Sequence, residues 1–114
     1  MLKIESGIKR RAIKTVIMGP EGIGKSTLAS QLPNPLFIDT ENGTSTLNVR
    51  RILCSSSWDE LIAIVNEVIA EPAICKTLVI DSADWAENLA EADVCTKNRV
   101  ASIEAISYGK IYRF

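Results

Sequence analysis

The sequence predicts an α/β fold in which helices flank a parallel sheet. Short apolar, β-branched runs alternate along the chain with segments that repeat apolar residues every three to four positions. Strands that alternate with helices in this way form right-handed βαβ crossovers, which bring successive strands together in parallel. The length of 114 residues fits one small domain.

Composition and charge place the chain among globular proteins. Apolar residues make up 46% and charged residues 24% of the sequence, which suits a folded domain rather than a disordered one. A formal net charge of −1 provides no overall attraction to nucleic acid or to an anionic membrane. No run reaches the roughly 18 apolar residues that cross a bilayer, and the N-terminus lacks the apolar core of a secretory signal. We therefore expect a cytoplasmic protein with no membrane partner.

The cysteines and the absence of histidine exclude several chemistries. Cys54, Cys75 and Cys95 are widely spaced and form no Cys-x-x-Cys pair, so we expect buried, reduced thiols. Without histidine the chain has almost no ligands for zinc, and neither Ser-His-Asp nor Cys-His catalysis is available.

Four apolar runs predict the strands. AIKTVIM, which precedes the first glycine of a glycine-rich stretch, has the length and the β-branched residues of a buried strand. TLVID shows almost no alternation, which is typical of a strand covered on both faces. The four expected strands are residues 12–18, 35–39, 51–54 and 77–81.

Three segments predict the helices. Residues 25–32 form a short one that ends before a proline. The second begins at a Ser-x-x-Glu capping box made by Ser57 and Glu60, and Pro72 ends it. Its apolar stripe is Leu61, Ile64, Val65, Val68 and Ile69. The third, residues 82–95, places Trp85, Leu89 and Ala92 on one face.

The stretch GPEGIGKS fits the pattern G-x-x-x-x-G-K-[ST] and predicts a P-loop, so the fold is expected to be that of a P-loop NTPase. Glycines let the backbone take positive φ and turn its N–H groups toward phosphate oxygens, at the start of a helix that attracts anions. Lys25 is expected to reach the β- and γ-phosphates, and the Ser26 hydroxyl to ligate Mg²⁺. The predicted nucleotide-binding residues are Gly19, Pro20, Glu21, Gly22, Ile23, Gly24, Lys25, Ser26 and Thr27.

Carboxylates at the ends of two predicted strands are candidates for the metal and for water activation. Asp81 closes TLVID and is the expected second Mg²⁺ residue, acting through the metal's water shell; the alternative is a helix cap. Ser82 follows it instead of a glutamate, so the catalytic base must lie elsewhere. Asp84 is one alternative, although it lies in a helix start and is better suited to cap that helix. We favour Glu41 as the base. It lies with Asp39 at the end of the strand of residues 35–39, and the ends of parallel strands converge on one crevice. The competing interpretation of Glu41 is a solvated loop carboxylate.

Three blocks in this order, GPEGIGKST, FIDTENGT and TLVIDSADW, resemble the RecA-like core of P-loop ATPases. The chain is most similar to phage and prophage ATP-binding proteins of the AAA/RecA-like type, which are linked to recombination and single-strand annealing. In that group the strand after the P-loop helix ends in Asp-x-Glu, whose glutamate activates water; Glu41 occupies this position. The resemblance implies ATP and Mg²⁺ as cofactors, single-stranded DNA as a partner and assembly into a homo-oligomer. It extends to a last block, Ser102-Ile103-Glu104 and Tyr108-Gly109-Lys110.

After that block the sequence departs from the family pattern. Ile111 stands where the family has a second glycine, and the sequence ends at Phe114, whereas family members continue with further strands. We expect one RecA-like P-loop domain over residues 1–114 that is incomplete at its C-terminus.

The expected function is a Mg-ATP-binding ATPase in phage DNA recombination or single-strand annealing. The alternative is a truncated nucleotide-binding remnant or interaction protein without turnover. A small-molecule kinase is disfavoured, because FIDTE and the lack of a basic lid segment do not suit it. The basic clusters, Lys9-Arg10-Arg11 with Lys14 and Arg50-Arg51, are best interpreted as solvated surface charge.

Overall fold

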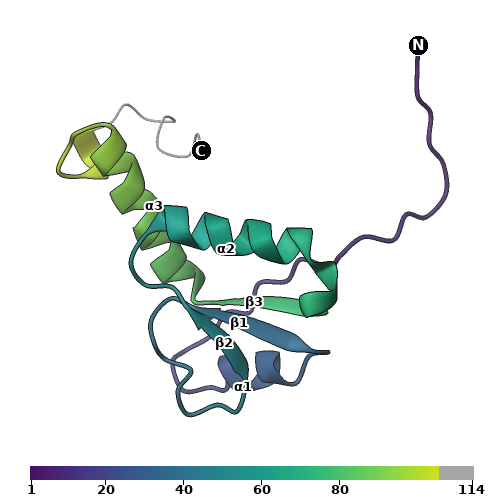
Figure 1. Ribbon diagram of the computed structural model, residues 1–114, viewed down its shortest axis with the longest axis horizontal. Helices are drawn as coiled ribbons and strands as arrows, with labels where there is room; N and C mark the ends of the chain where they lie inside the picture. The colour runs from purple at the N-terminus through teal and green to yellow at the C-terminus, as the bar shows by residue number, and fades with distance from the viewer. Residues whose placement is uncertain (106–114) are drawn as a thin grey trace.

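The computed structural model of the protein describes residues 1–105, and the predicted α/β fold with a parallel sheet flanked by helices is confirmed (Figure 1). The strands are β1 (Pro35–Asp39), β2 (Arg50–Leu53) and β3 (Thr77–Asp81), in the order β2-β1-β3 with every pairing parallel. The helices are α1 (Lys25–Ser30), α2 (Trp58–Ala70) and α3 (Ala83–Lys97), with 3₁₀ turns η1 (Pro72–Ile74) and η2 (Ile103–Ala105). The predicted block at residues 108–112 lies outside the described residues.

Register places the carboxyl ends of the strands side by side. Asp39 at the end of β1 pairs with Leu53 of β2 on one side and with Asp81 of β3 on the other. The backbone continues this contact one residue further, because the Thr40 N–H donates to the Asp81 carbonyl at 2.8 Å. The two acidic strand ends that the sequence singled out are therefore neighbours in the sheet.

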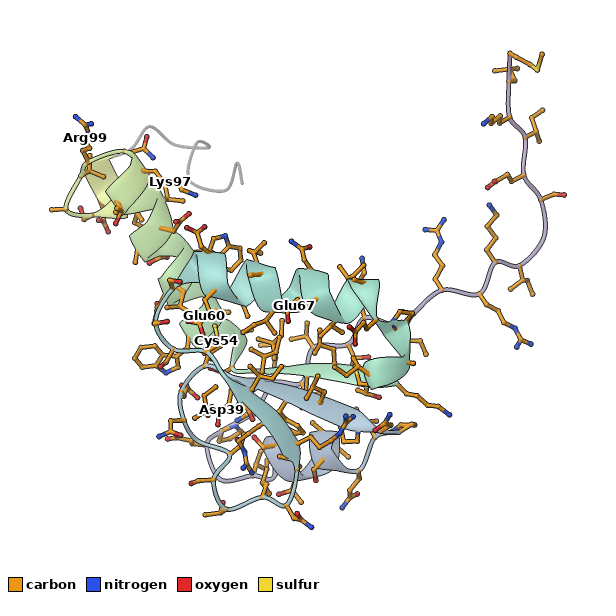
Figure 2. All side chains as sticks on the ribbon, viewed as in Figure 1. Asp39, Cys54, Glu60, Glu67, Lys97 and Arg99 are labelled. Atoms are coloured by element: carbon orange, nitrogen blue, oxygen red, sulfur yellow. The ribbon has the colours of Figure 1, made fainter. Side chains whose placement is uncertain are left out.

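The main core lies between the sheet and the helices α2 and α3, which lie above the sheet in Figure 1 while α1 lies below it. Ile38 of the central strand is fully buried there. It clusters with Cys54, Leu61 and Ala86, around which Trp58, Ile64, Val65 and Leu78 pack. Burial and the nearby Glu60 charge raise the pKa of the Cys54 thiol (Figure 2). This core fixes the strands whose ends carry the candidate site.

The expected strand at residues 12–18 is absent, and this prediction was wrong. All of residues 1–20 are exposed and lack regular secondary structure, with Ile13 90% exposed. A strand needs a partner with which to share its hydrogen bonds, and the described sheet has only three strands, with β2 and β3 at its edges. The β-forming composition of AIKTVIM is therefore not sufficient to place it in the sheet.

The expected cover of β3 on both faces is also wrong. β3 is an edge strand, and Ile80 is 42% exposed. The expected third helix is present as α3, which buries Ala86, Ala90 and Val94, whereas Trp85 is 47% exposed. Small alanine side chains let the helix axis approach the core closely, which a tryptophan at the contact would prevent.

Among residues 1–105, no helix has the length and apolar character that a membrane crossing requires.

Candidate functional site

The loop before α1 takes the backbone conformation that its glycines were expected to allow. Gly22 and Gly24 have φ of 79° and 104°, a region that residues with a Cβ rarely occupy. Gly24 is also the N-cap of α1, and its carbonyl accepts from the Leu28 N–H at 2.9 Å, which opens the helix. The sequence therefore produces the predicted order of glycine loop followed by helix, although no strand precedes it.

Lys25 folds back over this loop. Its ammonium donates to the carbonyls of Gly19 at 2.5 Å and Pro20 at 2.9 Å. The positive charge is thus held at the loop's own backbone, next to the place where the pattern predicts phosphates.

Ser26 and Asp81, the two predicted metal residues, are brought together by the fold. The Ser26 hydroxyl donates to the Asp81 carboxylate at 2.5 Å, across 55 positions of sequence. Hydroxyl and carboxylate oxygens are hard donors of the kind that Mg²⁺ takes, and one or two protein ligands suffice when phosphates and waters complete the shell. In the described part of the chain no group of three or more Asp, Glu, Cys or His could hold a metal by itself. The pair therefore fits Mg²⁺ only together with a phosphate ligand.

Asp39 is buried, at 1% exposure, and its carboxylate organises the turn that follows β1 (Figure 2). It accepts from the backbone N–H groups of Glu41 and Gly43 at 3.1 Å each, and from that of Thr44 at 2.9 Å. The Thr44 hydroxyl donates to it as well. Burial opposes ionisation, but these hydrogen bonds outweigh it, so the pKa of Asp39 lies below its ordinary value of 3.8.

Thr40, also 1% exposed, connects the end of β1 to the residue after β3. Its hydroxyl donates to the Ser82 carbonyl at 3.1 Å and accepts from the Ser82 N–H at 2.9 Å. Together with the bond from Thr40 N–H to Asp81, these contacts join the two strand ends through the buried Thr40.

Glu41, the predicted catalytic base, is exposed and follows directly after Thr40. Its backbone is held by Asp39, and its neighbour Thr40 is bonded to Asp81 and Ser82. Asp84 does not cap α3, contrary to expectation, and neither does Asp81, because Ser82 is the N-cap and its hydroxyl accepts from the Trp85 N–H. Ser26 is thus hydrogen-bonded to Asp81, Asp81 to Thr40, and Glu41 follows Thr40 in the chain.

The sequence did not predict the roles of Thr40, Thr44 and Arg51. Arg51 of β2 donates to the Thr44 hydroxyl and to the carbonyls of Thr44 and Leu47. These bonds tie the turn to β2. The signal that could have indicated the turn is the sequence DTENGT, because an aspartate before Asn-Gly-Thr suits a side chain that accepts from the following N–H groups.

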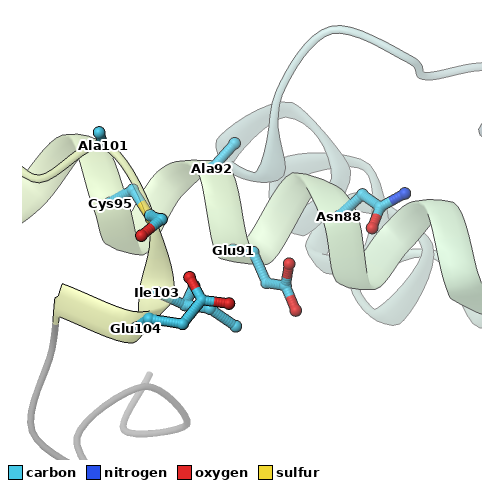
Figure 3. A pocket seen from close by; sticks show the side chains of 8 residues that line it. Asn88, Glu91, Ala92, Cys95, Ala101, Ile103 and Glu104 are labelled. Atoms are coloured by element: carbon cyan, nitrogen blue, oxygen red, sulfur yellow. The ribbon is translucent and has the colours of Figure 1, made fainter.

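A separate pocket of about 360 Å³ lies between α3 and the segment that follows it (Figure 3). Its lining includes Glu91, Cys95 and Glu104, and none of the predicted site residues. Two carboxylates of like charge do not suit a phosphate, so this pocket is not a second candidate for the nucleotide.

In a comparison with known protein families, residues 11–114 match a family described as AAA domain. The matched range contains the glycine loop and both acidic strand ends. No curated protein and no solved structure matched the chain.

Proposed function

Because this chain belongs to the AAA domain family, whose members are nucleotide-binding P-loop ATPases, we propose that it binds Mg-ATP in the loop of residues 19–27 and hydrolyses it. The observation that carries the proposal is the 2.5 Å contact between the Ser26 hydroxyl and the Asp81 carboxylate at the end of that loop. It supports the proposal because it joins the loop's hydroxyl to a strand-end carboxylate, as an NTPase of this kind requires.

Binding uses residues that already surround the loop. Lys25 exchanges its bonds to the Gly19 and Pro20 carbonyls for bonds to the β- and γ-phosphates. The Ser26 hydroxyl would ligate Mg²⁺, and the Asp81 carboxylate would hold the ion through its water shell. When bound there, the ion would supply charge neutralisation to the transferring phosphate.

Turnover needs a group that takes a proton from the attacking water. Glu41 is our candidate because it is exposed and follows a residue that is hydrogen-bonded to Asp81 and Ser82. Its carboxylate orients the water and accepts the proton as the bond to the γ-phosphorus forms, and ADP leaves.

The RecA-like character and the role in phage DNA recombination or single-strand annealing rest on the resemblance of GPEGIGKST, FIDTENGT and TLVIDSADW to that group. In this proposal ATP turnover is coupled to single-stranded DNA, and the protein acts as a homo-oligomer. Residues 1–114 are proposed to form one RecA-like unit.

The test measures Mg-ATP binding and phosphate release by the full chain, with and without single-stranded DNA. We expect Lys25→Ala to abolish binding, whereas Lys76→Ala, which alters an exposed lysine outside the loop, leaves it unchanged. We expect Glu41→Gln to keep binding and to lower turnover by about a hundredfold or more. Glu67→Gln, on exposed α2 surface, is the matched control.

Three results would separate the parts of the proposal. Binding that survives Lys25→Ala contradicts the assignment of the loop. Turnover that survives Glu41→Gln contradicts the assignment of the base alone. A rate that single-stranded DNA leaves unchanged removes the support for a DNA-linked role.

A second candidate is nucleotide binding without turnover. It is favoured by the absence of a strand at residues 12–18, which leaves the loop without the support expected on its N-terminal side. A wild-type chain that binds Mg-ATP but releases no phosphate even in a single-turnover assay would support this candidate over the ATPase.

A further inference from the structure

At the end of β1, two buried polar side chains, Asp39 and Thr40, directly precede the exposed carboxylate of Glu41. We propose that Asp39 and Thr40 are positioning residues for Glu41, which hold its backbone at a fixed place relative to Asp81. This inference rests on the proposed function of Glu41 as the base and adds how that base is held in place.

Asp39 fixes the backbone that follows it. Its carboxylate accepts from three backbone donors in the turn, the N–H groups of Glu41, Gly43 and Thr44. A charge at 1% exposure is costly unless it is hydrogen-bonded, so the turn is held in the shape that supplies these donors. The Glu41 N–H belongs to this set, so the peptide group that joins Thr40 to Glu41 is held at its N–H.

Thr40 fixes the same peptide group from the other direction. Both hydrogen-bonding functions of its hydroxyl are used by one residue, Ser82, and its own N–H is used by the Asp81 carbonyl. The peptide bond that joins Thr40 to Glu41 therefore begins at a residue tied to the backbone on both sides of the Asp81–Ser82 linkage. Movement of the Glu41 backbone relative to Asp81 would require breaking these bonds.

The arrangement places the constraint on the backbone and leaves the Glu41 side chain exposed to water and substrate. A purely structural role would need no relation to Glu41, and its loss would lower stability without changing the rate of a folded variant. A positioning role predicts that loss lowers kcat while nucleotide affinity is kept, and that the effect acts through Glu41.

The test compares three threonine variants in the full chain. Thr40→Val removes the hydroxyl and keeps the side-chain shape, whereas Thr40→Ser keeps a hydroxyl that can form the same bonds. Thr77→Val is the matched control, because Thr77 donates to the Pro33 carbonyl at 2.8 Å at the opposite end of the same sheet.

We expect Thr40→Val to lower kcat by about ten- to a hundredfold, the loss typical of small misplacement of a reacting group, with Kd for Mg-ATP unchanged. Thr40→Ser and Thr77→Val should keep wild-type kcat. In the Glu41→Gln background Thr40→Val should cause no further loss, since groups that act through one another are not additive. Asp39→Asn carries the same kinetic test if Thr40→Val does not fold.

Amide hydrogen exchange in the wild-type chain provides a readout that needs neither turnover nor a variant. The amides of Glu41, Gly43, Thr44 and Ser82 should exchange slowly because each has a buried acceptor. Rapid exchange at Glu41 and Ser82 would overturn the inference, and so would a folded Thr40→Val or Asp39→Asn with wild-type kcat. A wild-type chain without any turnover would instead contradict the ATPase itself, and the positioning role with it.

Discussion

A carboxylate at the end of a strand can bind a ligand or accept hydrogen bonds from the protein's own backbone, and Asp39 does the second. The sequence offered it beside Glu41 as a candidate near the γ-phosphate. The structure buries it at 1% exposure and surrounds it with backbone donors, so its charge is used to shape the turn. Glu41, two residues later, is exposed, so its side chain can contact a substrate.

The lowered pKa of Asp39 predicts a specific response to acid. In the unfolded chain the carboxyl has its ordinary pKa of 3.8, and in the folded chain the value is lower. As the pH falls below 3.8, the unfolded state therefore binds protons that the folded state does not, and stability falls until the folded pKa is passed. Urea unfolding between pH 7 and pH 2.5 should show this loss, and Asp39→Asn should be less stable at pH 7 and flatter below pH 4. An unchanged acid slope in Asp39→Asn would contradict the assigned cause.

How well the candidate site could be predicted depends on whether sequence spacing alone defines a residue's surroundings. The placement of Lys25 and Ser26 at the start of α1 could be predicted because the glycine pattern specifies a local backbone and its helix. The placement of Asp81 could be predicted because a strand end in a parallel sheet has a known location. Thr40 was not, because its role depends on a contact with Ser82, 42 residues away, that no local pattern encodes.

Among the elements, α2 shows how local signals are realised only in part. Ser57 caps the helix as predicted, and its hydroxyl accepts from the Glu60 N–H at 3.1 Å. The Glu60 carboxylate accepts from the Ser56 hydroxyl. The helix nevertheless runs from Trp58 to Ala70, close to the predicted bounds.

The cap predicts a measurable loss. Ser57→Ala leaves the Glu60 N–H without its side-chain acceptor, and the free energy of unfolding should fall by about 1 kcal/mol. Ser55→Ala, two residues before the cap and outside the helix, is the control and should stay within about 0.5 kcal/mol of wild type. Chemical denaturation monitored by circular dichroism measures both. Equal losses in the two variants would show that the cap bond contributes nothing of its own.

The strands divide into those that were predictable and one that was not. β1 and β3 have the predicted bounds, and β2 is shifted by one residue. All three form because each combines β-forming residues with a partner strand. Residues 12–18 have the composition but no partner within the described residues, so their backbone groups face water instead. Strand formation is a property of the pair, and one sequence segment reports only half of it.

At the scale of the whole molecule, the chain has a packed part and an extended part. The sheet and its helices hold the core, whereas residues 1–20 are exposed along their whole length and extend away from it (Figure 1). Five basic residues lie in that extended part, which also leads directly into the glycine loop: Lys3, Lys9, Arg10, Arg11 and Lys14.

Limited trypsin digestion should detect this division. Cleavage after Arg10, Arg11 and Lys14 should precede cleavage after Arg51, which lies half-buried in β2 and is hydrogen-bonded to the turn. Mass spectrometry of early time points would identify a fragment that begins near residue 15. Early protection of these sites, equal to that of Arg51, would mean that residues 12–18 are paired in solution.

The central position of β1 has a consequence for how the chain acquires its fold. β1 is the first strand of the sheet in sequence, yet one of its two neighbours, β3, follows about 42 residues later, the separation of Thr40 and Ser82. During synthesis the apolar strand PLFID therefore leaves the ribosome well before the segment that covers one of its edges exists. The loop between β1 and β3 must close before their pairing contributes any stability. Until then one edge of β1 has no partner strand, and its backbone groups are free to pair with another chain.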